Sequence, residues 1–294
     1  MILDVSALSF GAKQQWLQHA IAPRPIAFAS TVDKEGNTNL SPFSFFNLFS
    51  YDPSIVIFSV SRRGRDASTK HTLQNILEVP EVVINICDYD IVQQVSLASC
   101  EYPKGVDEFI KAGFTKQPAS VVKPPMVKEA KIKLECRVNE VKSLGDKGGA
   151  GQLVICEVLF MHVDESVLND EGTMIDQTRL ELIARLGGDW YSKITPESLF
   201  IAPKPNRQLG IGFDALPASI VNSRVLTGND LGILANVHEM PVIDPSYEDS
   251  VLKNIIQYYA INPDDMEREL HLHAQYLLRE GKVDEAWQVL LAGV

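Results

Sequence analysis

The sequence predicts a mainly β protein with short inserted helices, followed by a helical appendage at the C-terminus. Strand-length runs of apolar and β-branched residues recur between about residues 25 and 165. These runs do not alternate with long helices as they would in a doubly wound α/β fold, which favours an antiparallel barrel. From about residue 214 the apolar residues take helical spacing instead. We therefore expect a barrel domain in residues 1–213 and a helical extension in residues 214–294.

The individual strands follow from their composition and from the turns between them. Residues 33–37 (DKEGN) and 145–151 (GDKGGAG) are turns by composition, and the second lacks the G-x-G-x-x-G spacing of a dinucleotide-binding loop. Alternating apolar and polar residues in 130–141 indicate a strand with one solvated face. The expected strands are residues 25–32, 55–60, 81–86, 130–141 and 153–163, with short helices at 69–77, capped by Thr69, and at 90–98.

The C-terminal extension is expected to form three helices. They cover residues 249–260, 264–280 and 283–292, and the breaks fall at Pro263 and Gly281, because proline and glycine interrupt helices. Residues 278–290 resemble one half of a helical-repeat unit, but a single copy does not indicate a repeat array.

Composition and charge exclude several classes of protein. The chain has 294 residues, of which 45% are hydrophobic, and no apolar run approaches the roughly 20 residues of a membrane-spanning helix. Its first residues lack the pattern of a secretory signal, so we expect a cytoplasmic location. The net charge of -11 opposes general binding to nucleic acids. Any site for an anion must therefore be local.

Neither the cysteines nor the histidines have the spacing of a metal site, so none is predicted. His271 and His273 lie two residues apart on an expected helix, point to different faces and are expected to be solvated. The sequence motifs of serine hydrolases, P-loop proteins and zinc proteases are absent. The cysteines form no C-x-x-C pair and are expected to be thiols buried in strands: Cys87, Cys100, Cys136 and Cys156.

A basic loop is the first candidate site. Residues 61–65 (SRRGR) and Lys70 place four fixed positive charges within nine residues of an acidic chain. A phosphate monoester suits such a loop, because it accepts hydrogen bonds from arginine, lysine, hydroxyl and helix N-terminal amide groups together. The alternative is a solvated basic loop without a ligand.

Residues 39–47 (NLSPFSFFN) form the second candidate site. The mixture of aromatic, hydroxyl and amide side chains around Pro42 favours neither a strand nor a helix. A flat heteroaromatic ligand needs apolar contact on its face and hydrogen-bonding groups at its rim, which this mixture offers. The alternative is that the phenylalanines belong to the core; we expect this of Phe45 and Phe46 in either case.

Five pieces of sequence, in order, resemble the flavin reductase-like family of FMN-binding split-barrel proteins, which includes the flavoredoxins. The resemblance spans about residues 20–195 and does not include the helical extension. The pieces are residues 23–31 (PRPIAFAST), 39–47 (NLSPFSFFN), 70–76 (KHTLQNI), 101–109 (EYPKGVDEF) with 112–114 (AGF), and 185–191 (RLGGDWY).

The resemblance implies a six-stranded split barrel that forms a homodimer and holds one FMN per subunit near the interface. Lys-His-Thr at residues 70–72 replaces the common Lys-Asp-Thr, which leaves the role of His71 open. The resemblance assigns the flavin ring and ribityl chain to Thr31, Asn39, Ser41, Phe43, Ser44 and Asn47. It assigns the phosphate to Ser61, Arg62, Lys70 and Thr72. It brings Arg185, Gly187 and Gly188 towards the site, from the same chain or from its partner.

The resemblance further implies an oxidoreductase that accepts hydride from NADH or NADPH at flavin N5 and passes electrons to a flavin, a metal chelate or a small acceptor. No catalytic side chain is required, because the cofactor supplies the chemistry. Two alternatives stay open: an FMN electron carrier that serves a partner protein, and a binding module that does not use FMN. The sequence does not distinguish NADH from NADPH.

Overall fold

The protein is described from a computed structural model that covers residues 1–204 and 208–293. The chain divides into two compact units, Met1–Phe200 and Ile201–Val294. Each unit has its own hydrophobic core.

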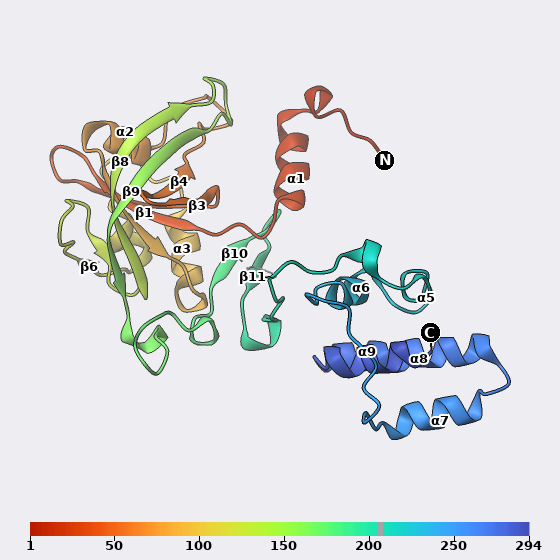
Figure 1. The fold of residues 1–294 in the computed structure, drawn as a ribbon. Helices are drawn as coiled ribbons and strands as arrows, with labels where there is room; N and C mark the ends of the chain where they lie inside the picture. The colour runs from red at the N-terminus through yellow and green to blue at the C-terminus, as the bar shows by residue number, and fades with distance from the viewer. Residues whose placement is uncertain (205–207, 294) are drawn as a thin grey trace. The chain divides into compact units, whose positions relative to one another are not determined.

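The first unit is mainly β, with helices inserted between strands (Figure 1). Its strands are β1 (Ala27–Val32), β2 (Thr38–Phe43), β3 (Phe46–Tyr51), β4 (Ser54–Ser59), β5 (Glu81–Ile86), β6 (Lys116–Gln117), β7 (Met126–Val127), β8 (Ile132–Ser143), β9 (Gln152–Val163), β10 (Ile183–Arg185) and β11 (Tyr191–Lys193). Its α-helices are α1 (Phe10–Ala20), α2 (His71–Glu78), α3 (Val92–Ala98) and α4 (Glu108–Ala112).

Seven strands form one antiparallel sheet in the order β2-β1-β5-β8-β9-β4-β3. Although β2 and β3 are the two edges of this sheet, only Ser44 and Phe45 connect them. The three Cα–Cα steps from Phe43 to Phe46 span at most about 11 Å, so the sheet must curl until its edges come close together. The result is a barrel that remains open along the seam between β2 and β3. The predicted antiparallel barrel is confirmed, with seven strands in the sheet where six were expected.

The expectation that residues 39–47 avoid regular structure is wrong. The segment forms most of β2, the short link and the start of β3. Pro42 is tolerated because β2 is an edge strand, whose outer side needs no backbone donor. The unusual composition of this segment therefore marks the seam of the barrel.

The barrel interior is filled by apolar side chains from both halves of the sheet. Phe58, Val82 and Ile84 are fully buried within it, and Leu73 of α2 packs against them. A second cluster lies between the sheet and the helices α3 and α4, where the rings of Phe28 and Phe114 lie 5.3 Å apart. These two clusters hold β1, β2 and α2 in fixed positions, and these elements carry most of the candidate site.

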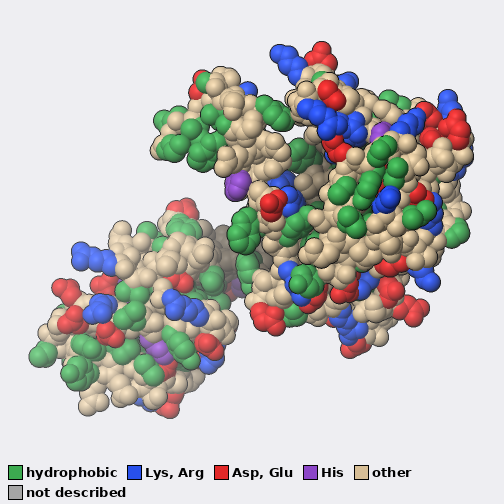
Figure 2. Space-filling view, turned by 180° about the vertical axis from the view of Figure 1, so that it is seen from behind, with side chains coloured by type: hydrophobic (Ala, Val, Ile, Leu, Met, Phe, Trp, Pro, Cys, Tyr) green, Lys and Arg blue, Asp and Glu red, His purple; other side chains and the backbone are tan. Residues whose placement is uncertain are grey.

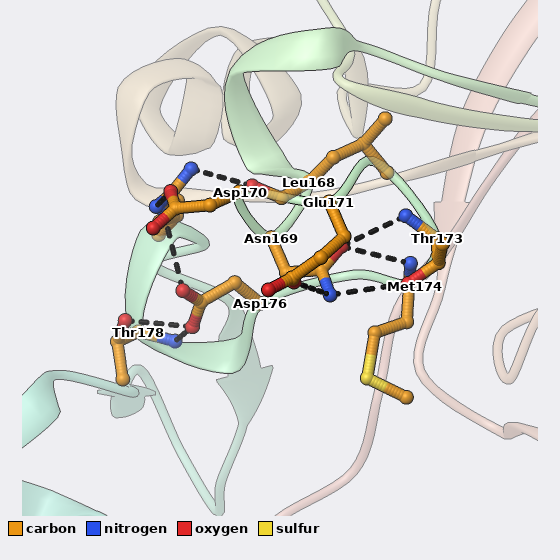
Figure 3. A network of polar contacts seen from close by, with 9 residues as sticks. Leu168, Asn169, Asp170, Glu171, Thr173, Met174, Asp176 and Thr178 are labelled. Atoms are coloured by element: carbon orange, nitrogen blue, oxygen red, sulfur yellow. Dashed lines mark hydrogen bonds and ion pairs between the residues drawn. The ribbon is translucent and has the colours of Figure 1, made fainter.

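A polar network organises the segment between β9 and β10 (Figure 3). The Asn169 side chain accepts hydrogen bonds from the backbone N–H groups of Thr173 and Met174 at 2.9 and 3.1 Å. Arg179 donates to the Leu168 carbonyl at 2.6 Å and pairs with Asp176 at 3.2 Å. This long connection is therefore folded on itself before the chain enters β10.

The second unit is helical, and its helices surround one core. Trp287 of α9 is fully buried, in a cluster that includes residues from each of the five α-helices described in this unit and from the segment before them. The three long helices confirm the prediction from spacing, whereas the two short ones had no clear sequence signal. The α-helices are α5 (Ala218–Val221), α6 (Gly228–Leu234), α7 (Ser250–Tyr258), α8 (Pro263–Arg279) and α9 (Val283–Leu291).

Two expectations about single side chains are wrong. His271 is buried, with Nδ1 at 2.7 Å from the hydroxyl of Ser223, and the largely buried His273 lies 2.6 Å from Asp249. The segments that carry Ser223 and Asp249 therefore cover both histidines, although the two side chains lie on different sides of α8. Cys100 is exposed after α3, while the other three cysteines are buried as expected.

Two features are absent from residues 1–204 and 208–293. None of the helices there combines the length and the apolar character needed to cross a membrane. Nor do three or more His, Cys, Asp or Glu side chains in these ranges come together in a way that could hold a metal ion.

Candidate functional site

A small pocket lies where β2, the start of α2 and the connection between α3 and α4 meet. It encloses about 30 Å³, far less than the roughly 300 Å³ or more that a drug-sized ligand fills. One end of a larger ligand fits there, and the rest would lie outside. The lining residues are Asn39, Ser41, Arg63, Lys70, His71, Thr72, Ala98, Ser99, Cys100, Glu101, Tyr102 and Glu108.

Helix α2 is fixed to the sheet by two polar residues on one face. Thr72 and Asn75 are three positions apart, so both side chains face β1 and β2. The Thr72 hydroxyl lies 2.5 Å from Oδ1 of Asn39, and Nδ2 of Asn75 donates to the Thr31 hydroxyl at 3.2 Å. Thr31 and Asn39 are direct cross-strand partners. The structure thus brings together Thr31, Asn39 and Thr72, three residues singled out in the sequence.

The start of α2 offers hydrogen-bond donors to the pocket. The helix begins at His71 and not near Thr69, and its N-cap residue, Lys70, makes no capping hydrogen bond within the described part of the chain. The first backbone N–H groups of a helix have no intrahelical acceptor, and together they attract an anion. Burial lowers the pKa of Lys70, and its ammonium group lies 5.4 Å from the centre of the Phe43 ring.

The basic loop lies beside this helix start and is held mainly by its own backbone. Ser61 is half-buried where the loop begins. Arg62 donates to the Ala67 carbonyl at 3.0 Å, while its buried Nε has no hydrogen-bond partner among the described residues. Arg63 donates to the Thr69 carbonyl at 2.6 Å. Of these two arginines, only Arg63 is among the residues that line the pocket.

Glu101 partly neutralises this loop from the opposite side of the pocket. Its carboxylate lies 3.4 Å from Nε of Arg63 and 2.6 Å from Nη1 of Arg65. The side chains of Arg65 and Glu101 are substantially exposed, so solvent weakens their ion pair. A phosphate could compete for Arg65 without breaking a buried ion pair.

His71 is half-buried at the edge of the pocket. Burial lowers its pKa, and the positive charges of Arg63 and Lys104 lower it further. The imidazole is therefore neutral at neutral pH. Compared with the Lys-Asp-Thr pattern of the resemblance, His71 removes a negative charge from the start of α2 and adds no fixed positive charge.

The seam residues differ in how they face the pocket. Ser41 lines the pocket and Ser44 is half-buried in the link, whereas the exposed Asn47 accepts a hydrogen bond from its neighbour Leu48 at 2.8 Å. Phe43 is 5% exposed, and its ring packs against Phe58 in the barrel core. Phe43 therefore belongs to the barrel core, with one ring face towards the Lys70 ammonium group, and does not line the pocket.

The two following phenylalanines have different environments. Phe46 is partly buried and packs against the barrel core, as expected. Phe45 is 45% exposed, so its assignment to the core is wrong. It lies in the link between β2 and β3, where no neighbouring strand covers it.

Arg185, Gly187 and Gly188 lie at a different place in the unit. They belong to the β10–β11 hairpin, where Gly188 has a φ of +58° and Arg185 stacks on the Tyr191 ring at 4.5 Å. Gly187 contacts His19 of α1 so closely that an added Cβ would lie 2.3 Å from its ring. None of the described contacts links these three residues to the pocket.

Sequence reasoning missed six residues that line the pocket: Ala98, Ser99, Cys100, Glu101, Tyr102 and Glu108. All six belong to the α3–α4 connection or its flanking helices, and the segment 101–109 was noticed only as part of a resemblance. Burial raises the pKa of Glu108, and hydrogen bonds from Leu40 and Asn39 partly oppose that rise. A buried glutamate in a short helix has no periodic signal, so only the folded structure shows its partners.

Comparisons with known proteins support the resemblance to flavin reductase-like proteins that the sequence indicated. The family model described as "Flavin reductase like domain" matches residues 19–180. An uncharacterised protein of Halalkalibacterium halodurans is 36% identical over 195 residues, covering 66% of this chain and 92% of the relative.

Two solved structures resemble the first unit. Nitrilotriacetate monooxygenase component B from Bacillus cereus superposes with a TM-score of 0.64 and 29% identity, covering 69% of this chain and 98% of that one. A protein of Shewanella frigidimarina, described as a candidate flavin reductase with a split barrel domain, superposes with a TM-score of 0.57 and 26% identity. This match covers 68% of this chain and 96% of that one. The chain belongs to the flavin reductase-like family, and its open barrel is the split barrel. This membership supports a redox function that involves a flavin.

Proposed function

We propose that this protein is an FMN-binding oxidoreductase that accepts hydride from NADH or NADPH and passes the electrons to a second flavin, a metal chelate or a small acceptor. The main support is the start of α2, where the first backbone N–H groups, the Lys70 side chain and Arg63 of the basic loop meet at one pocket. This donor set fits the phosphate of FMN.

The remaining contacts follow from the position of the phosphate. With the phosphate beside Lys70, the ribityl chain and ring would extend along the seam past Ser41 and Ser44. Bound FMN would supply the hydride-accepting atom, N5 of the ring. The protein would bind the phosphate, orient the ring and leave one face open to the nicotinamide. No acid or base from the chain is required.

A second copy of the chain would complete the site, as the family resemblance implies. The pocket holds only one end of a flavin, and none of the residues of α1 is buried. Phe10, Trp16 and Leu17 of α1 and Phe49 of β3 are 44 to 63% exposed. Figure 2 shows hydrophobic side chains gathered on α1 and a hollow between α1 and the barrel. Light scattering on the purified protein should therefore give the mass of a homodimer.

Anaerobic stopped-flow mixing tests the proposed activity. FMN-loaded protein is mixed with NADH and, separately, with NADPH, and the flavin absorbance is followed. We expect one nucleotide to bleach the flavin rapidly, which also identifies the physiological donor. Slow or absent bleaching with both, together with rapid reduction by an added reductase, would support the alternative of an electron carrier.

A further inference from the structure

A buried carboxylate closes the inner end of the pocket. Glu108, the first residue of α4, is 4% exposed. One of its oxygens accepts a hydrogen bond from Nδ2 of Asn39 at 3.0 Å, and the other accepts from the backbone N–H of Leu40 at 3.1 Å. Both acceptors therefore point at β2, in the segment that carries Asn39 and Ser41.

The carboxylate determines which way round the Asn39 amide lies. Both oxygens of Glu108 accept hydrogen bonds in the structure, so the NH₂ group of Asn39 faces Glu108 and its oxygen faces away. That oxygen lies 2.5 Å from the Thr72 hydroxyl. Because a hydroxyl has one proton, Thr72 must donate that proton to Asn39. All three side chains are buried, which restricts other arrangements.

We infer that Glu108 is a positioning residue. It orients Asn39 so that the Thr72 hydroxyl donates its proton to Asn39 and does not donate to the flavin phosphate. The phosphate is then bound by Lys70, the first backbone N–H groups of α2 and the basic loop. The inference rests on the proposed function, and it gives Thr72 a different role from the phosphate contact that the family resemblance implies.

Replacement of Glu108 by glutamine should reverse the network without breaking it. The fixed N–H of Leu40 requires the glutamine oxygen, so the glutamine NH₂ group faces Asn39. The Asn39 amide must then turn over and donate to Thr72, whose hydroxyl becomes an acceptor. The proton of Thr72 is thereby free to turn towards the pocket. Every buried group keeps a partner, so the Glu108→Gln variant should fold.

Comparison of FMN with riboflavin isolates the phosphate, because the two ligands share the ring and ribityl chain. The dissociation constants of both ligands are measured for the full chain. The dissociation constant of riboflavin divided by that of FMN, here called the ratio, reports the contribution of the phosphate. Lys70→Ala should lower this ratio about tenfold or more, as expected for a lost hydrogen bond to a charged group. Thr72→Val should leave the ratio within about twofold of wild type, whereas loss of a direct hydrogen bond to the phosphate would lower it about tenfold or more.

The double variant provides a result that a merely structural role could not give. Glu108→Gln should raise the ratio above the wild-type value, and adding Thr72→Val should return it to that value. If Thr72→Val alone lowers the ratio as Lys70→Ala does, or if Glu108→Gln has the same effect with and without Thr72, the inference is wrong. Wild-type protein that fails to bind FMN, or a Lys70→Ala ratio equal to that of wild type, would overturn the proposed phosphate site and the inference with it.

Discussion

Single residues fix the end of the β8–β9 hairpin and the start of α1. Gly149 has a φ of +84°, and a Cβ added there would lie 2.1 Å from the Phe10 ring. The same ring lies close to Gly64 of the basic loop. Two glycines therefore form a notch for Phe10, which joins α1 to the loop proposed to hold the phosphate.

Gly149→Ala should destabilise the protein more than backbone strain alone explains. The matched control is Gly36→Ala, because Gly36 also has a φ of +84° but has no atom within 4 Å of an added Cβ. Strain should cost both variants about 1 kcal/mol. Gly149→Ala must also displace Phe10, so its melting temperature should fall further than that of Gly36→Ala. Equal melting temperatures would show that Phe10 does not occupy the notch.

At the scale of elements, one glutamate ties a strand to a loop. Glu135 of β8 is fully buried and accepts the N–H groups of Ser120 and Val121, both at 2.7 Å. The ring of His162 lies 2.6 Å away on β9, diagonally across the strand pair. Burial by itself would raise the pKa of Glu135, but these hydrogen bonds outweigh it and hold the pKa below the ordinary value of 4.5.

Glu135→Gln should therefore lower stability in a pH-dependent way. A carboxylate whose pKa is lowered by folding stabilises the protein above its unfolded pKa, and this contribution is lost as the pH falls through the folded pKa. The free energy of unfolding of the variant should be about 1–3 kcal/mol lower than that of the wild type near neutral pH. This difference should shrink below about pH 4.5. Melting temperatures from pH 7 to pH 3 measure it, with the exposed Glu140→Gln on the same strand as control. A difference independent of pH would contradict this account.

At the scale of the whole molecule, the two units have separate cores. The buried apolar residues of Ile201–Val294 form one cluster, and those of Met1–Phe200 form others. We expect the helical unit to unfold without loss of the barrel. The proposed flavin site uses residues of the first unit alone.

Trp287→Ala tests this separation. Removal of the largest fully buried side chain should cost the helical unit about 3–5 kcal/mol. Calorimetry should show one transition moving to lower temperature while a second transition and the FMN affinity stay unchanged. Trp190→Ala, at a side chain that is 73% exposed, is the control. A loss of FMN binding in the Trp287 variant would show that the units are coupled.

The sequence predicts those parts of the molecule that depend on local patterns. Alternation in β8 and helical spacing in α8 identify these elements because each pattern repeats over many residues. The seam escapes prediction, because the edge positions of β2 and β3 depend on distant strand pairing. Glu108 escapes for the same reason, since its partner Asn39 is 69 residues away in sequence. His271 was misjudged because the sequence of one helix does not show which distant segment covers a given side chain, here the segment that carries Ser223.

Titration of the cofactor-free protein with FMN tests the central claim most directly. Wild type should bind FMN and become yellow, and Lys70→Ala combined with Arg62→Ala should weaken binding by several kcal/mol, since each charge-assisted hydrogen bond contributes about 1.5–3 kcal/mol. Lys128→Ala with Arg137→Ala removes the same charge from exposed positions and should bind as wild type does. A wild-type protein that does not bind FMN, or a Lys70/Arg62 variant with unchanged affinity and intact fold, would contradict the account.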